Sequence, residues 1–339
     1  MRKPAVMGRF SVLASLKLAF AAMLLLAAVV LASHFEESVS RAWMAVPLAV
    51  LAVNLLAALL CNPRLRGQPG LALFHIALLL LCVLAGVETM TRLHGRIELA
   101  EGQTFSVQDI HVEEKGPWHP GGLHHLAFTQ GPIDVEFAPG LVRQRARSQV
   151  RIGIEEPANG DEELTDDKAL ELGGYRFSVT PNKGFAAVLE WRGEDGGEFA
   201  GAVHLPSFPA REWKQEQRWT TPGGEHVVIA LVLAKRPPRE RAWMLRSQLG
   251  GASIEIRTAN ISVKLQPGEA VKLRRGTLRL REIALWMGYR VDYQSLLPWM
   301  LWIALLGLCG LAWYVMGRFW RTNDAKSEGM MAGAVRSRA

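Results

Sequence analysis

The chain has 339 residues, a formal net charge of +7 and 49% hydrophobic residues. Residues 88–292 carry 27 Lys and Arg against 28 Asp and Glu, so the basic excess lies in the short segments beside the apolar stretches. The positive charge is therefore a membrane-topology signal, and no nucleic-acid partner is expected from it.

Four apolar stretches are long enough to cross a bilayer. They cover residues 13–33, 42–61, 70–87 and 295–317. A helix needs about 20 predominantly apolar residues to span the hydrocarbon core. Lys17 lies inside the first stretch, where its long stem can carry the ammonium group to the interface. The layout predicts an integral membrane protein with three spans, a long polar region and a fourth span.

Basic residues at the ends of the spans predict the orientation. They precede the first span, separate the second from the third, and follow the fourth. Short loops rich in Lys and Arg stay in the cytoplasm. We therefore expect residues 1–12 and the basic tail 318–339 in the cytoplasm, and residues 88–294 outside. The basic residues are Arg2, Lys3, Arg9, Arg64, Arg66, Arg318 and Arg321.

A cleaved signal peptide is the alternative interpretation of the first stretch. The chain begins with basic residues, and small residues stand at Ala32 and Ser33, where a signal peptidase would cut. The next span begins at residue 42, so cleavage would leave a very short N-terminus. Under either interpretation, residues 88–294 lie outside.

Cysteine use limits the chemistry of the outer region. The three cysteines, Cys61, Cys82 and Cys309, fall in or at the edge of spans. The outer region therefore has no disulfide, even in an oxidising compartment. The chain has no C-x-x-C, which excludes a thioredoxin-like reductase, and no C-x-x-C-H, which excludes covalently attached c-type haem.

Residues 88–294 are expected to form a β-rich external domain, a sandwich or an open barrel. Polar and apolar residues alternate in several short segments, which is typical of half-buried antiparallel strands. Turn sequences such as Pro139-Gly140 and Pro267-Gly268 separate these segments. The expected strands are residues 96–99, 134–137, 149–154, 175–179, 227–233, 253–256 and 262–265.

Two segments of this domain are predicted to differ from strands. Pro237-Pro238 can begin a helix and Gly250-Gly251 can end it. Ala242, Leu245 and Leu249 would then share one face of that helix. Residues 159–167 hold five carboxylates and are expected to form a solvated loop. A calcium loop is the alternative, although the positions do not follow the EF-hand ligand order.

His75 is the candidate functional residue of the spans. It lies about a turn into the third span, within Leu73-Phe74-His75-Ile76. An imidazole in hydrocarbon needs a polar partner or a cavity, and it is also a common axial ligand of haem iron. Two interpretations stay open here: a structural histidine bonded to a neighbouring helix, or a ligand.

Other histidines lie at or beyond the ends of the spans. Four fall within residues 111–125 and could hold copper or zinc, but Pro and Gly residues between them predict a solvated loop. His34 and His94 are interfacial, and the sequence shows no partner for either. Trp43 is expected in an aromatic belt at the outer interface. No paired-carboxylate, Ser-His-Asp or Cys-His arrangement is recognisable. The four loop histidines are His111, His119, His124 and His125.

Three segments carry a family resemblance. The first span begins Leu13-Ala14-Ser15-Leu16-Lys17, and Phe74-His75 with a run of Leu is followed by Gly95-Arg96-Ile97-Glu98-Leu99-Ala100-Glu101-Gly102. Residues 286–320 form a strand, a span and a basic exit. With the span layout, these segments resemble the ResB family, also called CcsB, of the two-component cytochrome c synthesis machinery. The external domain is shorter than is usual in that family, and Asp292-Tyr293-Gln294-Ser295 stands where the family has Asp-Pro-Gly.

The resemblance implies that the chain handles haem. His75 would be one axial ligand to haem crossing the membrane, and a CcsA- or ResC-type membrane protein would supply the other ligand and present haem to apocytochrome c. The chain has no Trp-rich haem-presenting segment, so it would be a non-catalytic subunit of the assembly complex. The membrane would be a bacterial cytoplasmic (inner) membrane.

Two alternatives from other classes stay open. One is a membrane-tethered binding or sensory protein whose β-sheet domain recognises an external ligand. The other is a metal-loading protein that uses the loop 111–125.

Overall fold

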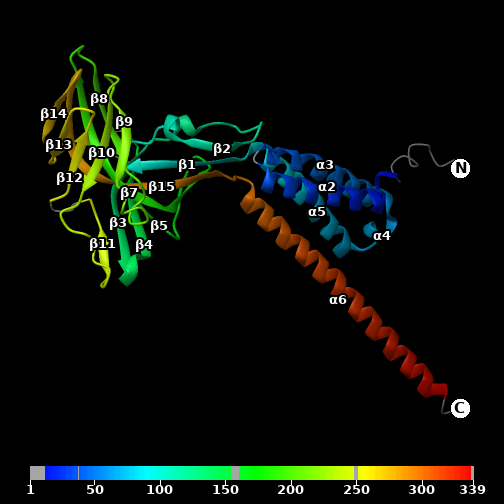
Figure 1. The fold of residues 1–339 in the computed structure, drawn as a ribbon. Coiled ribbons are helices and arrows are strands. Elements are labelled where there is room, and N and C mark those ends of the chain that lie inside the picture. Colours follow the sequence, from blue (N-terminus) through cyan, green and yellow to red (C-terminus); the bar gives the residue numbers. More distant parts are fainter. Residues whose placement is uncertain (1–11, 37, 154–159, 248–250, 337–339) are drawn as a thin grey trace. The chain divides into compact units, whose positions relative to one another are not determined.

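A computed structural model describes residues 12–36, 38–153, 160–247 and 251–336 (Figure 1). The chain divides into two compact units. A helical unit holds the described residues up to Leu93, residues 114–120 and those from Gln294 onward. A β-rich unit holds residues 94–113 and the described residues between 121 and 293. The predicted fold class, four apolar helices flanking a β-rich domain, is confirmed.

The helical unit contains four helices that are long and apolar enough to cross a membrane, so the chain is a multi-pass membrane protein. The candidate spans are Leu16–Phe35, Arg41–Cys61, Pro69–Thr91 and Leu297–Phe319. The helices are α2 (Leu16–Phe35), the 3₁₀ helix η1 (Arg41–Met44), α3 (Ala45–Cys61), the short α4 (Pro63–Arg66), α5 (Pro69–Thr91) and α6 (Leu297–Arg336).

The first helix is built into this unit by a buried amide. Ser15 caps α2, because its hydroxyl accepts a hydrogen bond from the backbone N–H of Lys17 (3.3 Å). Asn54 of α3 is 6% exposed, and its side-chain amide donates to the carbonyls of Leu13 (2.6 Å) and Ser15 (3.0 Å). An amide in hydrocarbon needs such acceptors. Asn54 therefore links α3 to the start of α2.

Small residues allow α5 and α6 to pack closely. A Cβ added to Gly70 would lie 2.7 Å from both the carbonyl oxygen of Gly310 and the backbone nitrogen of Tyr314. A Cβ added to Gly307 would lie 2.9 Å from the Cβ of Ala77. Close backbone approach through Gly and Ala is typical of helix pairs in membranes, where dispersion contacts replace the hydrophobic effect.

The β-rich unit contains three antiparallel sheets (Figure 1). The long strands β7 and β15 pair from Gly276–Gly193 to Tyr293–Tyr175, with bulges between Leu280 and Glu282 and between Met287 and Tyr289. In the largest sheet the order is β2 (His111–Lys115), β1 (Leu93–Ala100), β15 (Gly276–Tyr293), β7 (Tyr175–Gly193) and β6 (Leu170–Leu172), while β14 (Ala270–Leu273) pairs with β15 and β8 (Glu198–His204) with β7.

The other two sheets have four strands each. The period-two segments of the sequence fall on strands, as predicted, although Ile154 lies outside the described residues. One sheet has the order β11 (Trp243–Leu245), β3 (Phe128–Ala138), β4 (Val142–Ile152) and β5 (Asp161–Thr165). The other has the order β13 (Ser262–Leu265), β12 (Ser253–Arg257), β10 (His226–Val232) and β9 (Glu216–Thr220).

A buried polar network joins two of these sheets. The hydroxyl of Tyr289 on β15 donates to Gln130 Oε1 (2.6 Å) and lies 2.5 Å from Ser148 Oγ, and both partners belong to the β3–β4 sheet. All three side chains are buried, and burial raises the pKa of the Tyr289 hydroxyl. Fully paired polar groups of this kind fix one arrangement of a core, because any other leaves them unsatisfied.

The predicted helix at residues 237–250 is wrong. Residues 243–245 form strand β11, which pairs with β3 in the register Trp243–Phe137 and Leu245–Val135. The Trp243 ring stacks on Phe137, with centroids 5.0 Å apart, and Leu245 is fully buried. Leu249 lies outside the described residues. Proline before a segment and glycine after it are compatible with either a helix or a strand. Stacking on Phe137, which is more than 100 residues away in the sequence, favours the strand.

The predicted solvated loop at residues 159–167 is also wrong in part, although Asn159 lies outside the described residues. Strand β5 pairs with β4, with Asp161 opposite Arg151 and Glu163 opposite Gln149. Arg151 Nε lies 3.5 Å from an Asp161 carboxylate oxygen, and Arg147 contacts Glu163 at 3.8 Å. The acidic residues therefore form an edge strand, because opposite charges face them across the pair.

Candidate functional site

The candidate site in the helical unit is the imidazole of His75. Its helix, α5, begins with Pro69 at the first helical turn and has no charged residue between Gly70 and Val87. His75 lies less than two turns, about 9 Å, from the start of the helix. Its side chain is half-buried, and its ring meets that of Phe74 edge to face at 5.6 Å.

One hydrogen bond assigns the tautomer of His75. Its Nδ1 lies 2.8 Å from the carbonyl oxygen of Leu71, one turn earlier in the same helix. A carbonyl only accepts, so Nδ1 carries the proton and donates it. In the neutral ring the lone pair is then on Nε2, and no described residue is hydrogen-bonded to that atom. Metal-ligating histidines are commonly held in this way, with the second ring nitrogen donating to a carbonyl.

The direction of the His75 side chain follows from the packing of α5. Gly70 and Ala77 face α6. His75 is offset from Ala77 by about 200° around the helix axis. It lies eleven residues before Gly86, hence on nearly the same face, and a Cβ at Gly86 would pass 3.8 Å from the Cβ of Leu48 in α3. His75 therefore leaves α5 on a side turned away from α6, and its bond to Leu71 does not tie two helices together.

The sequence shows no partner for His94, and the structure supplies two. Its Nδ1 lies 2.6 Å from Asp292 on β15, and its Nε2 lies 3.2 Å from Glu113 on β2. Both neighbours are carboxylates, which accept hydrogen bonds from a ring nitrogen that carries a proton. His94 and Asp292 are 198 residues apart, so only the β1–β15 pairing brings them together. His34 is exposed at the end of α2.

The histidines of residues 111–125 occupy different local structures. His111 is exposed at the start of β2, and the neighbouring exposed rings of His124 and His125 are 3.9 Å apart. His119 differs from the predicted solvated histidine, because its Nδ1 lies 2.8 Å from the carbonyl oxygen of Thr91. In the described part of the chain, no three His, Cys, Asp or Glu side chains are grouped to hold a metal ion.

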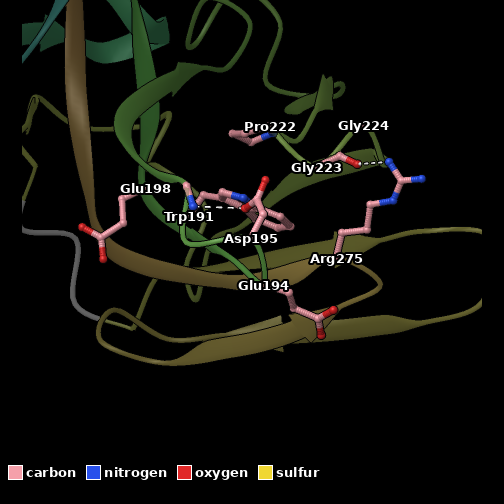
Figure 2. Close-up of a pocket in the computed structure, with 9 residues that line it drawn as sticks. Trp191, Glu194, Asp195, Glu198, Pro222, Gly223, Gly224 and Arg275 are labelled. Carbon is pink, nitrogen blue, oxygen red and sulfur yellow. Dashed lines mark hydrogen bonds between the residues drawn. The ribbon is translucent and has the colours of Figure 1, made fainter.

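Several surface cavities lie in the described part of the β-rich unit, and two of them are lined in part by aromatic side chains. One, of about 420 Å³, lies at the β7–β8 turn (Figure 2). Here Arg275 donates to the carbonyl of Gly223 (3.1 Å), and Asp195 accepts from the N–H of Gly197 (3.0 Å). Its polar side chains are thus largely engaged with the chain itself. Trp191, Glu194, Glu198, Pro222 and Gly224 complete its lining.

The second cavity, of about 730 Å³, is a groove beside β8 and β9. The His204 ring stacks on Trp286, with centroids 5.6 Å apart, and His204 Nδ1 lies 3.4 Å from Glu98. His204 Nε2 is fully covered, so it is not open to a ligand entering from the groove. This groove therefore offers no second imidazole for a metal or haem.

Lys183 on β7 is a buried cation that the sequence does not reveal. It is 5% exposed, donates to the carbonyl of Pro181 (3.2 Å) and lies 5.2 Å from the centroid of the Phe137 ring. Burial, with a contribution from the charge of Arg143, lowers the pKa of the Lys183 ammonium from 10.5 to about 8. The sequence gives no sign of this, because Lys183 lies beyond the segment 175–179 that predicts a strand, and the bulged pairing of β7 and β15 sets its depth.

The shifted pKa of Lys183 predicts a pH-dependent stability. Between pH 8 and 10.5 the unfolded chain binds more protons than the folded chain, so stability should rise with pH in that window. The gain should be on the order of 2 kcal/mol. Lys183→Met should raise the melting temperature of the detergent-solubilised chain at pH 7 and remove most of this rise. Lys264→Met, at an exposed position, should keep it; equal behaviour of the two variants would contradict the prediction.

Neither a protein-family model nor a curated protein matches the chain. Among solved structures, the chain is similar to the cytochrome c haem lyase CcmF, with a TM-score of 0.29 and 10% sequence identity. The match covers 88% of this chain and 34% of that chain, so the present chain spans about a third of the length of that protein. The structural similarity to this haem lyase is distant and carries no argument about the site.

Proposed function

We propose that the chain is a non-catalytic membrane subunit of a cytochrome c assembly complex, and that His75 provides one axial ligand to haem within the membrane. The three segments that resemble the ResB family support the class of function. The geometry of His75 carries the assignment of the residue, because its Nδ1–H is held by Leu71 and its Nε2 is left with the lone pair.

The donor set fits one half of a bis-imidazole site. Haem iron accepts neutral imidazole nitrogen as an axial ligand. His75 is the described histidine that lies inside a span and away from its end, since His34 lies in the last turn of α2 and His94 beyond α5. A single imidazole on one helix holds haem weakly, so the second ligand is expected from a CcsA- or ResC-type membrane protein. That partner would approach α5 on a side turned away from α6, next to α3.

In this proposal the external domain binds the partner or apocytochrome c. With no cysteine among residues 88–294, it cannot form a mixed disulfide with the apoprotein's Cys-x-x-Cys-His thiols. The domain would therefore bring reduced thiols and haem together without exchanging electrons with them. In this assignment the membrane is the bacterial cytoplasmic membrane, and residues 88–294 face outward.

The test is co-purification of the full chain with a CcsA- or ResC-type protein in mild detergent, followed by an absorption spectrum. A low-spin spectrum typical of two imidazole ligands supports the proposal. A stable complex that carries no haem after expression in haem-replete cells would count against it.

The orientation can be tested separately. A reporter enzyme that is active only outside the cytoplasm should be active when it is fused after Gly160, because basic residues flank the spans on the opposite side. Fused after Pro63 or Asn323, it should be silent. The reverse pattern would place residues 88–294 in the cytoplasm and would remove the basis for delivery of haem to an external apoprotein.

A further inference from the structure

Residues 114–120 return to the C-terminal end of α5, although β1 lies between them in the sequence. They pack with the helical unit. Three carbonyls that the helix end leaves without intrahelical partners are satisfied by this segment. The pairs are Gly116 N to Arg92 O (2.8 Å), Trp118 N to Met90 O (2.8 Å) and His119 Nδ1 to Thr91 O (2.8 Å).

The approach of this segment to α5 leaves no room for a side chain at residue 116. A Cβ added to Gly116 would lie 2.2 Å from the carbonyl oxygen of Met90. Glu114 adds ion pairs at the same place, 3.7 Å from Arg41 and 4.0 Å from Arg92. The segment is therefore fixed at the helix end by backbone bonds and charges, which sets the position of the residues that follow Gly116.

Two large indole side chains are exposed at this end of the helical unit. Trp118 and Trp43 are each 64% exposed. Trp43 lies in η1, at the start of the second span, and the Arg41–Glu114 ion pair joins η1 to the segment that carries Trp118. Because the backbone N–H of Trp118 donates to the carbonyl of Met90, the backbone of Trp118 lies at the C-terminal end of α5, where the third span ends.

The chemistry of this surface suits the headgroup region of a bilayer. An indole has an apolar body and one polar N–H, and Trp is enriched where apolar chains meet water. The charges of Arg41, Arg92 and Glu114 beside it suit the polar side of the same boundary.

We propose that residues 116–119 form a membrane-surface anchor, in which Trp118 inserts into the lipid headgroup region at the C-terminal end of α5, at the same end of the helical unit as Trp43. The occupant of this surface is lipid, because the surface continues directly from the spans that lipid surrounds. The anchor fixes the depth of α5, and with it the depth of His75, independently of the haem assignment.

The experiment uses the full chain in liposomes. Cys61, Cys82 and Cys309 are replaced by serine, and a single cysteine is introduced by Trp118→Cys or Trp213→Cys. Trp213 is the matched control, because it is an exposed tryptophan (78%) of the β-rich unit. Each thiol is labelled with a fluorophore, and quenching is measured with lipids that carry a nitroxide at the headgroup or deep in the acyl chain.

The probe at residue 118 should be quenched several-fold more by headgroup nitroxides than by deep ones, while the probe at 213 should be quenched little by either. The unlabelled thiol at 118 should also react more slowly with a water-soluble maleimide than that at 213. Equal quenching at the two positions would overturn the proposal. The proposal would also be overturned if the thiol at residue 118 were protected from the maleimide only in the presence of the partner protein. The partner, and not lipid, would then cover this surface.

Discussion

Replacing His75 with alanine should lower the haem that co-purifies with the two-protein complex by roughly tenfold or more, because an axial nitrogen is lost outright. Mature cytochrome c should fall with it. Imidazole added to cells or to the purified complex should partly restore both, since it can occupy the position that the His75 ring leaves. Haem is measured by absorption, and cytochrome c by haem staining of membranes.

The controls for this experiment follow from the positions of the other histidines. His34→Ala and His124→Ala remove exposed imidazoles and should leave haem content unchanged. His119→Ala is a poor control, because His119 caps α5 through Thr91. A structural role for His75 would instead lower protein level or partner binding, with no rescue by imidazole. Normal haem in His75→Ala at normal expression would exclude the ligand assignment.

Gly70→Ala should destabilise the helical unit strongly for a change of one methyl group. The added Cβ would lie 2.7 Å from backbone atoms of Gly310 and Tyr314, and backbone cannot move aside as a flexible side chain can. Overpacking of this kind costs about 1–3 kcal/mol. The melting temperature of the detergent-solubilised chain, followed by tryptophan fluorescence, should fall by several degrees.

Gly86→Ala is the matched control in the same helix. Its added Cβ would meet Leu48 at 3.8 Å, which is an ordinary van der Waals contact. Alanine is the better helix former, by up to about 1 kcal/mol. Gly86→Ala should therefore leave the melting temperature unchanged or raise it slightly. If the two variants melt alike, close packing of α5 on α6 is not the reason for glycine at position 70.

The spans and most strands are predictable because their signals are local. A bilayer imposes one length and one polarity on each helix, and a half-buried strand alternates with period two. The wrong predictions arise where residues far away in the sequence determine the secondary structure. Residues 243–245 become a strand because Phe137 offers a stacking surface, and residues 161–165 do so because arginines of β4 face them.

The candidate site likewise has features that the sequence predicts and features that depend on distant contacts. The position of His75 in an apolar stretch is visible in the sequence, but its tautomer depends on the hydrogen bond to Leu71. The partners of His94 could not be predicted, because Glu113 and Asp292 meet it only through the register of three strands. Trp118 gives no local sign of its place, since the capping of α5 by residues 116–119 joins segments that β1 separates.

The strand order of the largest sheet has a consequence for synthesis of the chain. Strand β15 lies between β1 and β7, yet it is the last strand of the domain along the chain and precedes α6 almost directly. Tyr289, which completes the buried network with Gln130 and Ser148, is on this strand.

During synthesis the sheet therefore lacks its central strand until the residues just before α6 have been made. Such long-range pairing folds slowly and leaves strand edges exposed meanwhile. The edges of β1 and β7 that pair with β15 thus stay uncovered until the end of the domain has been synthesised.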